Sequence, residues 1–417
     1  MSVEVKRRKS LTDIAVENEH YLSDFAYTTG FLQRLLTIIG IWALVKISPK
    51  KKEILFAIIF IAISLLLIVF LMIPMVLHLV YTKQNLKGKM KLFGPILLRV
   101  ANLTKFYWMI YRRKSIRYCL EHVRDDWKMA TGPSDREIMR KSSSNGRQMV
   151  ILCIFFMYTA GIFYQAVLPL MRGKKINALN QTIRPFAYQI YDRYPAAQRS
   201  PNYEIIFYTT IVSAFVTYTT IISSCSLAAT FVWHACGQID VIMNRLQTMF
   251  DNLDGDVELL NTRVSVVVKY HVRLLRLADT IDNALSEICL TEVVSSTFFF
   301  CSLGWRLTHQ LRAHDYVAIV TYGVYIVTIT YNLFIFCYIG EILKGQCAQI
   351  GENTYLSDWW KMPGKTGQAM VLVIAMASIP RGLTAGGIME LSVTNFVSII
   401  KTSVAYIRLI MSRDWTS

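Results

Sequence analysis

One apolar run decides what kind of protein this chain can form. Between Ile54 and Tyr81 the sequence is predominantly apolar, and only Pro74 and His78 interrupt the run. As an α-helix, this run is long enough to cross a hydrocarbon core of about 30 Å. The chain is therefore predicted to insert into a lipid bilayer.

The composition of the whole chain indicates several membrane crossings. The 417 residues are 53% hydrophobic and have a mean hydropathy of +0.37, which is too apolar for an ordinary soluble enzyme of this size. The formal net charge of +17 comes mainly from short basic clusters beside apolar runs, where they orient segments against anionic lipid headgroups. We therefore expect contact with membrane lipid and no nucleic-acid binding. We also expect no cleaved signal peptide, because no apolar segment of that kind lies near the start.

Hydrophobic periodicity predicts an all-α integral membrane protein with seven transmembrane helices. The predicted spans are 54–81, 92–111, 149–170, 203–231, 288–307, 316–340 and 391–411. The second is the weakest, because Arg99, Asn102 and Lys105 interrupt it, and hydropathy alone would miss it. A short apolar helix over 369–379 ends before Pro380, so it cannot span.

The distribution of Lys and Arg predicts the orientation of these spans. Seven spans place the termini on opposite sides, and basic residues favour the cytoplasmic side. With the N-terminus inside, clusters such as Lys6–Lys9 and Lys50–Lys52 are cytoplasmic, and the short basic loop 83–91, which argues the other way, is outweighed. The C-terminus is then extracellular, as is the glycosylation sequon Asn180-Gln-Thr.

The sequence contains no recognisable catalytic or metal-binding pattern. The seven His residues are scattered, and neither His-Glu-x-x-His, Cys-x-x-Cys nor a Gly-rich phosphate loop occurs. The eight cysteines lie in or just past apolar runs, so no disulfide framework is expected. We therefore predict no enzyme activity, no cofactor and no metal. Glu292 and Arg99 are charges inside predicted spans, which mark either a function or a helix-to-helix pairing.

The last span is not evenly apolar. Ser392, Asn395, Ser398 and Thr402 recur three or four residues apart, so they share one face of a helix. In lipid such a stripe needs a polar partner, which is either a neighbouring helix or a water-filled path. The spacing leaves both alternatives open.

Segments spread over most of the chain share an order and spacing with one known family. They are Arg34-Leu-Leu-Thr-Ile-Ile-Gly-Ile-Trp, Leu120-Glu-His-Val-Arg-Asp-Asp-Trp, Ser200-Pro-Asn-Tyr-Glu-Ile-Ile-Phe, His234 to Gln238, Cys337-Tyr-Ile-Gly-Glu, Tyr355 to Trp359, Pro380 to Gly387, and Leu391 to Tyr406. Together they resemble the insect odorant receptor family. Ala405 departs from the family, which usually has Ser before Tyr406, and the chain lacks the ending typical of gustatory receptors.

The resemblance implies a subunit of a non-selective cation channel, opened by a small volatile odorant in the plasma membrane of a sensory neuron. Family subunits form tetramers around a pore lined by the last helix, and odorant-tuned subunits associate with a shared co-receptor subunit. This chain resembles a tuned subunit, because its 236–287 segment is shorter than that of the co-receptor. One alternative is a gustatory receptor channel. Another is a G-protein-coupled receptor, suggested by seven spans and by Asp192-Arg193-Tyr194, but that triplet lies on the predicted outer side.

The resemblance also implies a division of the chain and a set of candidate residues. The parts are a cytoplasmic N-terminal segment with an amphipathic helix (1–53), spans one to six with the ligand pocket (54–340), a cytoplasmic helical anchor region (341–382) and the pore-lining last span (383–417). The candidate ligand-binding residues are Tyr158, Gly161, Phe163, Tyr164, Gln165, Tyr208, Val212, Tyr322 and Tyr325. The candidate pore residues are Ser398, Thr402, Leu409 and Ser412. Ordinary helix packing is the alternative for both sets.

The predicted orientation is testable with epitope tags on the full chain. With the last span running outward, we expect an antibody to reach a C-terminal tag on intact cells, and an N-terminal tag only after permeabilisation. Immunofluorescence before and after permeabilisation measures both. A C-terminal tag that is reached only after permeabilisation would contradict this topology.

Overall fold

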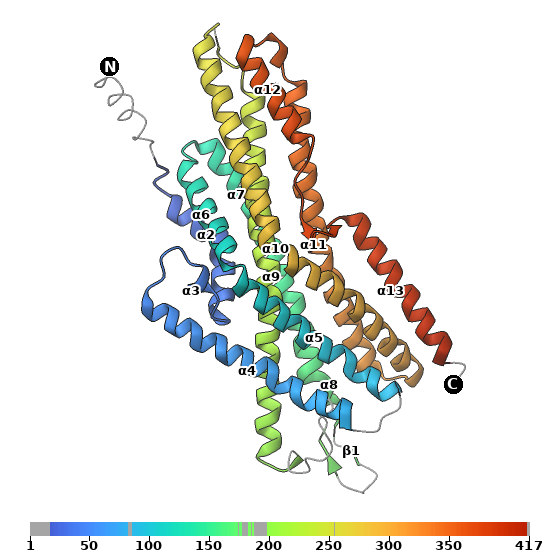
Figure 1. The fold of residues 1–417 in the computed structure, drawn as a ribbon. Coiled ribbons are helices and arrows are strands. Elements are labelled where there is room, and N and C mark those ends of the chain that lie inside the picture. The colour runs from blue at the N-terminus through green and yellow to red at the C-terminus, as the bar shows by residue number, and fades with distance from the viewer. Residues whose placement is uncertain are drawn as a thin grey trace.

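The computed structural model describes residues 17–81, 86–173, 175–176, 182–184, 186, 198–253 and 255–414. The Asn180 sequon and the Asp192-Arg193-Tyr194 triplet lie outside this part of the chain. Within it the architecture is a bundle of long helices with two short hairpins (Figure 1). The predicted all-α membrane fold is confirmed.

The elements follow one another with short connections. The helices are α2 (Tyr21–Ile38), α3 (Trp42–Val45), α4 (Lys51–Tyr81), α5 (Leu86–Tyr111), α6 (Arg113–Met129), α7 (Pro133–Ile162), the π-helix η1 (Phe163–Val167), α8 (Leu168–Arg172), α9 (Asn202–Gln247), α10 (Val257–Ala313), α11 (Tyr316–Leu356), the 3₁₀-helix η3 (Trp359–Lys361), α12 (Gly364–Ala377) and α13 (Val393–Asp414). The antiparallel hairpins are β1 (Lys175–Ile176) with β2 (Thr182–Ile183), and β3 (Thr384–Ala385) with β4 (Met389–Glu390).

Hydropathy alone identifies only part of the membrane bundle. Among the described residues, five helical segments are long and apolar enough to cross a membrane: α4, α7 with η1 and α8, α9, α10 and α11. The second and last predicted spans correspond to α5, with 26 residues, and α13, with 22 residues. Both helices have a spanning length but carry polar side chains, and this explains why an average over the sequence misses them.

Three of the helices extend far beyond their predicted spans. α9 continues to Gln247, α10 begins at Val257 and α11 runs to Leu356. The Asp256 side chain accepts hydrogen bonds from the backbone N–H groups of Glu258 and Leu259, which caps the start of α10. The extensions pack together with α12 at the upper end of the bundle in Figure 1. A hydropathy window detects only the apolar section of such helices. It therefore places the ends of α9 and α11 too early and the start of α10 too late.

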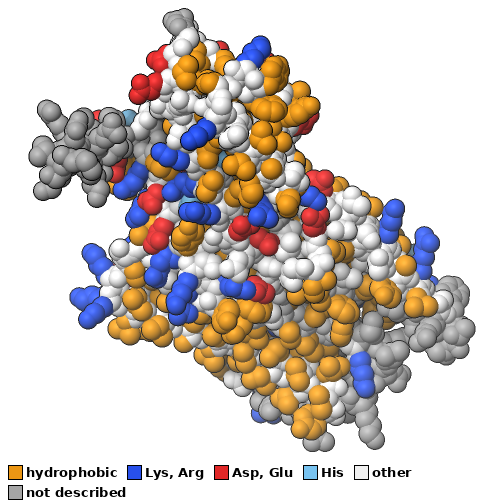
Figure 2. Space-filling model, turned by 45° about the horizontal axis from the view of Figure 1, so that its top comes forward, with side chains coloured by type: hydrophobic (Ala, Val, Ile, Leu, Met, Phe, Trp, Pro, Cys, Tyr) orange, Lys and Arg blue, Asp and Glu red, His pale blue; other side chains and the backbone are white. Residues whose placement is uncertain are grey.

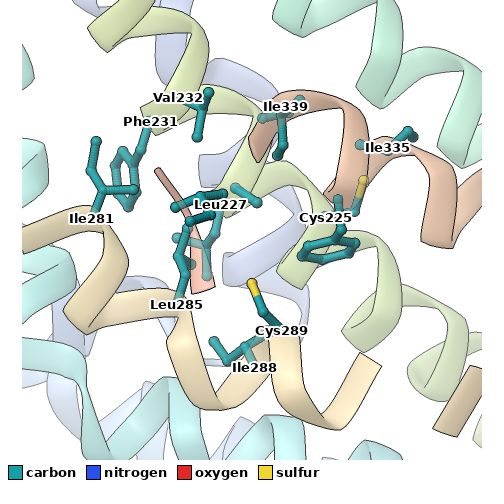
Figure 3. Packing of buried hydrophobic residues seen from close by; sticks show 14 of the residues in the cluster. Cys225, Leu227, Phe231, Val232, Ile281, Leu285, Ile288, Cys289, Ile335 and Ile339 are labelled. Atoms are coloured by element: carbon teal, nitrogen blue, oxygen red, sulfur yellow. The ribbon is translucent and has the colours of Figure 1, made fainter. Parts of the chain in front are cut away.

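The centre of the bundle is a continuous apolar core between α9, α10 and α11. Leu227 and Phe231 of α9, Ile281 and Leu285 of α10, and Ile339 of α11 are all fully buried (Figure 3). Side chains that interdigitate at this density hold the long helices in one relative arrangement. This core extends into the region where α9, α10 and α11 pass beyond their predicted spans.

The predicted N-terminal segment, residues 1–53, contains two helices, α2 and α3, which are separated by a turn. Gly40 adopts a left-handed conformation with φ +82°, and a Cβ atom there would lie 2.7 Å from the carbonyl oxygen of Ala57. This close approach of α4 requires glycine, so the chain bends between α2 and α3.

The surface separates into an apolar and a charged region. Figure 2 shows hydrophobic side chains gathered over the lower part of the molecule, whereas Lys, Arg, Asp and Glu gather above. α4, for example, exposes large apolar side chains along its length, among them Leu55, Phe56 and Leu66. An apolar surface of this extent fits contact with lipid.

A buried ionic cluster joins α6, α9 and α10 outside the predicted spans. The Asp126 carboxylate of α6 lies 2.9 Å from Nε2 of His234 and accepts a 2.6 Å hydrogen bond from Nε of Arg273. Burial raises the pKa of the Asp126 carboxyl, but the imidazoles of His122 and His234 and the Arg273 charge outweigh it, so its pKa lies below the usual range. The carboxylate therefore remains ionised and ties three helices together.

We expect Asp126→Asn to destabilise the protein by about 3 kcal/mol or more, because it leaves Arg273 and His234 without their buried anion. Thermal unfolding of the purified full chain in detergent measures the change. Asp125→Asn is the matched control, because Asp125 is half-exposed and, among the described residues, its ion pair is with the neighbouring Arg124. If both substitutions lower the unfolding temperature equally, the buried cluster stabilises the protein no more than an exposed ion pair does.

Candidate functional site

Two cavities lie inside the helix bundle, each with a volume of about 30 Å³. We call the first the arginine cavity, because Arg306 lines it together with Tyr164, Ser302 and residues of α5. We call the second the ion-pair cavity, because Lys105 and Glu292 line it.

The arginine cavity is built around a cation and three tyrosines. Nη1 of Arg306 donates hydrogen bonds to the hydroxyl oxygens of Tyr164 at 3.3 Å and Tyr322 at 3.2 Å. The guanidinium also lies 5.6 Å from the centre of the Tyr322 ring. The ring of Tyr164 lies 5.6 Å from that of Tyr325. The aromatic faces and hydroxyl oxygens stabilise a positive charge that lipid would not accept.

A π-helical turn presents part of this wall. Tyr164 and Gln165 lie in η1, where one extra residue per turn interrupts the helix that begins with α7, and both side chains are buried. π-turns inserted into α-helices occur often at functional sites, because they redirect side chains that regular helical spacing would place elsewhere. Here the turn points Tyr164 toward α10 and α11.

The ion-pair cavity contains a fully satisfied buried pair. Lys105 of α5 forms an ion pair with Glu292 of α10, and both residues are 3% exposed. The other carboxylate oxygen accepts hydrogen bonds from Nδ2 of Asn332 at 2.6 Å and from Oγ of Ser296 at 2.9 Å. Removing one partner of such a buried pair is strongly destabilising, because it leaves the other charge uncompensated. Arg99, the other charge in the second span, instead donates a 3.2 Å hydrogen bond to Oγ of Ser213 in α9.

Three side chains separate the two cavities. Leu98, Phe299 and Tyr325 line both of them. The Tyr325 hydroxyl is 2.9 Å from the Tyr218 hydroxyl, so the partition is held at one point by a hydrogen bond. Each cavity has room for about two water molecules. A small organic ligand therefore needs these side chains to move, and their movement would join the cavities.

The structure brings together only some of the candidate ligand-binding residues. Tyr164, Tyr322 and Tyr325 surround the arginine cavity or its guanidinium. Gly161 lies behind the Tyr218 ring, which lines the ion-pair cavity. Gln165 is buried in η1, Phe163 is half-buried there, and Tyr158 bonds Thr219 and stacks on Phe215.

Two candidates lie on the outside of the bundle. Tyr208 is 66% exposed and Val212 is 50% exposed, both on α9, and neither lines the two cavities. Conversely, sequence reasoning missed Phe299, Ser302 and Arg306 of α10. The predicted fifth span ends at residue 307, next to Arg306, whereas the helix continues to Ala313. The position of Arg306 at the end of an apolar run was the signal that could have identified it, because a charge within a span marks a function or a partner.

The last helix presents its candidate pore residues on one exposed face. Ser398, Thr402, Leu409 and Ser412 are all exposed. At about 100° per residue they cluster on the side opposite the buried face of Ile399 and Ser403. α13 packs mainly against α10 and α11 and stands at the side of the bundle (Figure 1).

The connection between α12 and α13 is closely packed. Gly386 and Gly387 have φ of +65° and +69° and form the turn of the β3–β4 hairpin. The Thr384 backbone N–H donates a 2.7 Å hydrogen bond to Asp282 of α10. Gly340 of α11 allows Leu391 to approach, since a Cβ atom there would lie 2.5 Å from the Leu391 carbonyl oxygen.

Comparisons with known proteins agree on one family. A sequence model described as 7tm Odorant receptor matches residues 85–404. Odorant receptor 82a of Drosophila melanogaster is 25% identical over 214 residues, which are 51% of this chain and 54% of that protein. Odorant receptor 10 of Aedes albopictus is 24% identical over 214 residues, 51% of this chain and 56% of that protein. The chain thus spans about half the length of these curated relatives in the matches.

A solved structure shares the fold. The insect olfactory receptor OR5 from Machilis hrabei, solved in complex with eugenol, superimposes with a TM-score of 0.73. The match covers 93% of this chain and 99% of that one at 13% sequence identity. The helical arrangement is therefore shared although the sequences have diverged widely.

Gly161 is expected to tolerate no side chain. A Cβ atom there would lie 2.5 Å from Cε2 of Tyr218, so Gly161→Ala forces the ring toward the ion-pair cavity and costs about 1–3 kcal/mol of stability. The control is Gly323→Ala on α11, where nothing lies within 4 Å of the added carbon. Thermal unfolding in detergent compares the two variants. A Gly161 variant as stable as the Gly323 variant would contradict the close packing.

Proposed function

The chain belongs to the 7tm odorant receptor family, and from this premise we propose that it is one subunit of a ligand-gated, non-selective cation channel. A small volatile molecule opens the channel, and a co-receptor subunit completes it. The subunit acts in the plasma membrane of a sensory neuron, with its N-terminus in the cytoplasm. Residues 54–340 hold the ligand pocket, 341–382 form a cytoplasmic anchor and 383–417 line the pore.

The observation that carries the proposal is the exposed polar face of α13. Ser398 and Thr402 lie on a helix of spanning length, and they point away from α10 and α11. An exposed stripe of hydroxyl groups in a bilayer is solvated better by water or by another protein than by lipid. Copies of α13 arranged around a common axis supply a water-filled path, with Leu409 as an apolar constriction. Lys401 and Arg408 are also exposed but lie to one side of this face, so they need not repel cations in the pore.

α10 provides a mechanical link between ligand and pore. Leu303 and Arg306 line the arginine cavity, and Gly304 lies between them. A Cβ atom at Gly304 would lie 2.3 Å from Cδ1 of Ile407, so α13 packs directly against the α10 backbone there. A ligand that enters the cavity and shifts α10 therefore displaces α13. It favours the open state to the extent that it binds that arrangement more tightly.

The decisive experiment is expression of the full chain with and without a co-receptor subunit, while volatiles are screened for current. We expect current only in the combined cells. The proposal fails if no volatile produces current with the co-receptor although the chain reaches the cell surface. A full response of the chain alone would instead contradict the role of a tuned subunit.

Leu409→Ala is expected to raise the current measured without ligand several-fold, because a smaller side chain weakens an apolar gate that excludes water. Val404→Ala is the matched control, since Val404 is 43% exposed on the same helix but lies away from the polar face. Whole-cell recording with the co-receptor present measures both variants. The gate assignment is wrong if both change the basal current equally.

A further inference from the structure

The arginine cavity contains a positive charge without a neutralising partner. Within the described part of the chain, no Asp or Glu forms an ion pair with Arg306, whose polar partners are the hydroxyl groups of Tyr164 and Tyr322. Its Nε atom is buried and has no hydrogen-bond partner there. A guanidinium is always charged and carries five N–H donors, and the donor at Nε is unused among the described residues.

A second unused donor lies beside it. Ser302 precedes Arg306 by one helical turn on α10, lines the same cavity and is 2% exposed. Its hydroxyl has no hydrogen-bond partner among the described residues. Gly94 of α5 leaves space in front of it, because a Cβ atom at Gly94 would lie 2.6 Å from the Ser302 hydroxyl oxygen.

The rest of this cavity is apolar. Leu98, Phe299 and Leu303 form its walls, and Leu98 and Phe299 also face the ion-pair cavity. In that second cavity the Lys105 charge is already neutralised by Glu292, which Asn332 and Ser296 also bond. The unsatisfied positive charge thus lies at one end of an apolar space, and the far end offers no free charge.

We propose that the arginine cavity recognises a carboxylate, so that the ligands of this subunit are short-chain carboxylic acids. This inference rests on the proposed function. The carboxylate accepts paired hydrogen bonds from the Arg306 guanidinium and one from the Ser302 hydroxyl. The acyl chain displaces Leu98 and Phe299 and extends toward the ion-pair cavity.

The charge of the ligand head group is the deciding feature. A neutral amide or ester accepts hydrogen bonds but leaves the buried guanidinium without an anion. Hydrogen bonds to charged groups contribute about 1.5–3 kcal/mol, so an ionised acid is favoured over its neutral isostere by roughly 10- to 100-fold. A carboxylic acid is ionised at neutral pH, like a Glu side chain.

The test compares hexanoate with hexanamide on cells that express the full chain with the co-receptor. We expect hexanoate to open the channel at a concentration at least about ten-fold lower than hexanamide. Arg306→Gln should raise the effective concentration of hexanoate by about ten-fold or more while leaving that of hexanamide nearly unchanged. Arg306→Lys keeps the positive charge but loses the planar pair of N–H donors that binds both carboxylate oxygens. Its effective concentration of hexanoate should therefore lie between those of the unaltered chain and of Arg306→Gln.

Arg312→Gln is the matched control, because Arg312 lies exposed near the end of the same helix and does not line the cavity. It should leave both responses as in the unaltered chain. If Arg306→Gln fails to reach the cell surface, Ser302→Ala decides, with an expected selective loss of about five-fold for hexanoate. Thermal stabilisation of the purified chain by hexanoate, compared with hexanamide, gives a readout that does not depend on current.

Several outcomes overturn the carboxylate assignment. Hexanoate that is no more potent than hexanamide shows that the cavity does not select an anion. Equal losses for both probes in the Ser302 or Arg306 variants show that these residues only support the fold. Failure of the proposed function is distinct, since it requires that neither these probes nor any other volatile produces current. If neutral volatiles produce current and hexanoate does not, the carboxylate assignment is refuted and the proposed function stands.

Discussion

A charge inside a membrane bundle has to find its partner within the protein, and this requirement determines how the central helices meet. Lys105 of α5 and Asn332 of α11 both bind the buried carboxylate of Glu292, which lies on α10. The surrounding lipid cannot solvate any of these groups, so rotation or sliding of one helix would leave a charge unsatisfied. The pair therefore defines the relative positions of the helices that enclose both cavities.

Arg306 shows the other solution to the same requirement. It is surrounded by tyrosine hydroxyls and rings, which stabilise a cation without neutralising it. One cavity is thus electrostatically complete and the other is not, although they share Leu98, Phe299 and Tyr325 as a partition. α10 carries both Glu292 and Arg306, and it contacts α13 at Gly304, where Ile407 packs against its backbone. The Asp126 cluster joins the extended parts of α9 and α10 to α6, at a distance along the chain from both cavities.

Sequence reasoning predicted the helices better than the walls of the cavities. It identified the spans, including the interrupted second one, because the minimum length for crossing lipid is independent of packing. It also identified Tyr164 and Tyr325, which line the arginine cavity. It included Tyr208 and Val212, which face outward, because spacing shows which residues share a helical face but not where that face points. Arg306 was overlooked, since a basic residue near the end of a span is ordinarily a surface anchor.

By itself, the sequence determined the membrane class, the number of spans and the polar stripe on the last helix, because these follow from local patterns of length, polarity and spacing. The family followed from the resemblance of its segments to known members. Only the tertiary structure decided which charges pair. It showed that Glu292 is neutralised by Lys105, whereas Arg306 has no anionic partner among the described residues, and that the stripe of α13 faces away from its own bundle. The physical reason is that pairing and exposure depend on the relative rotation of helices. That rotation is set by packing between residues far apart in the chain.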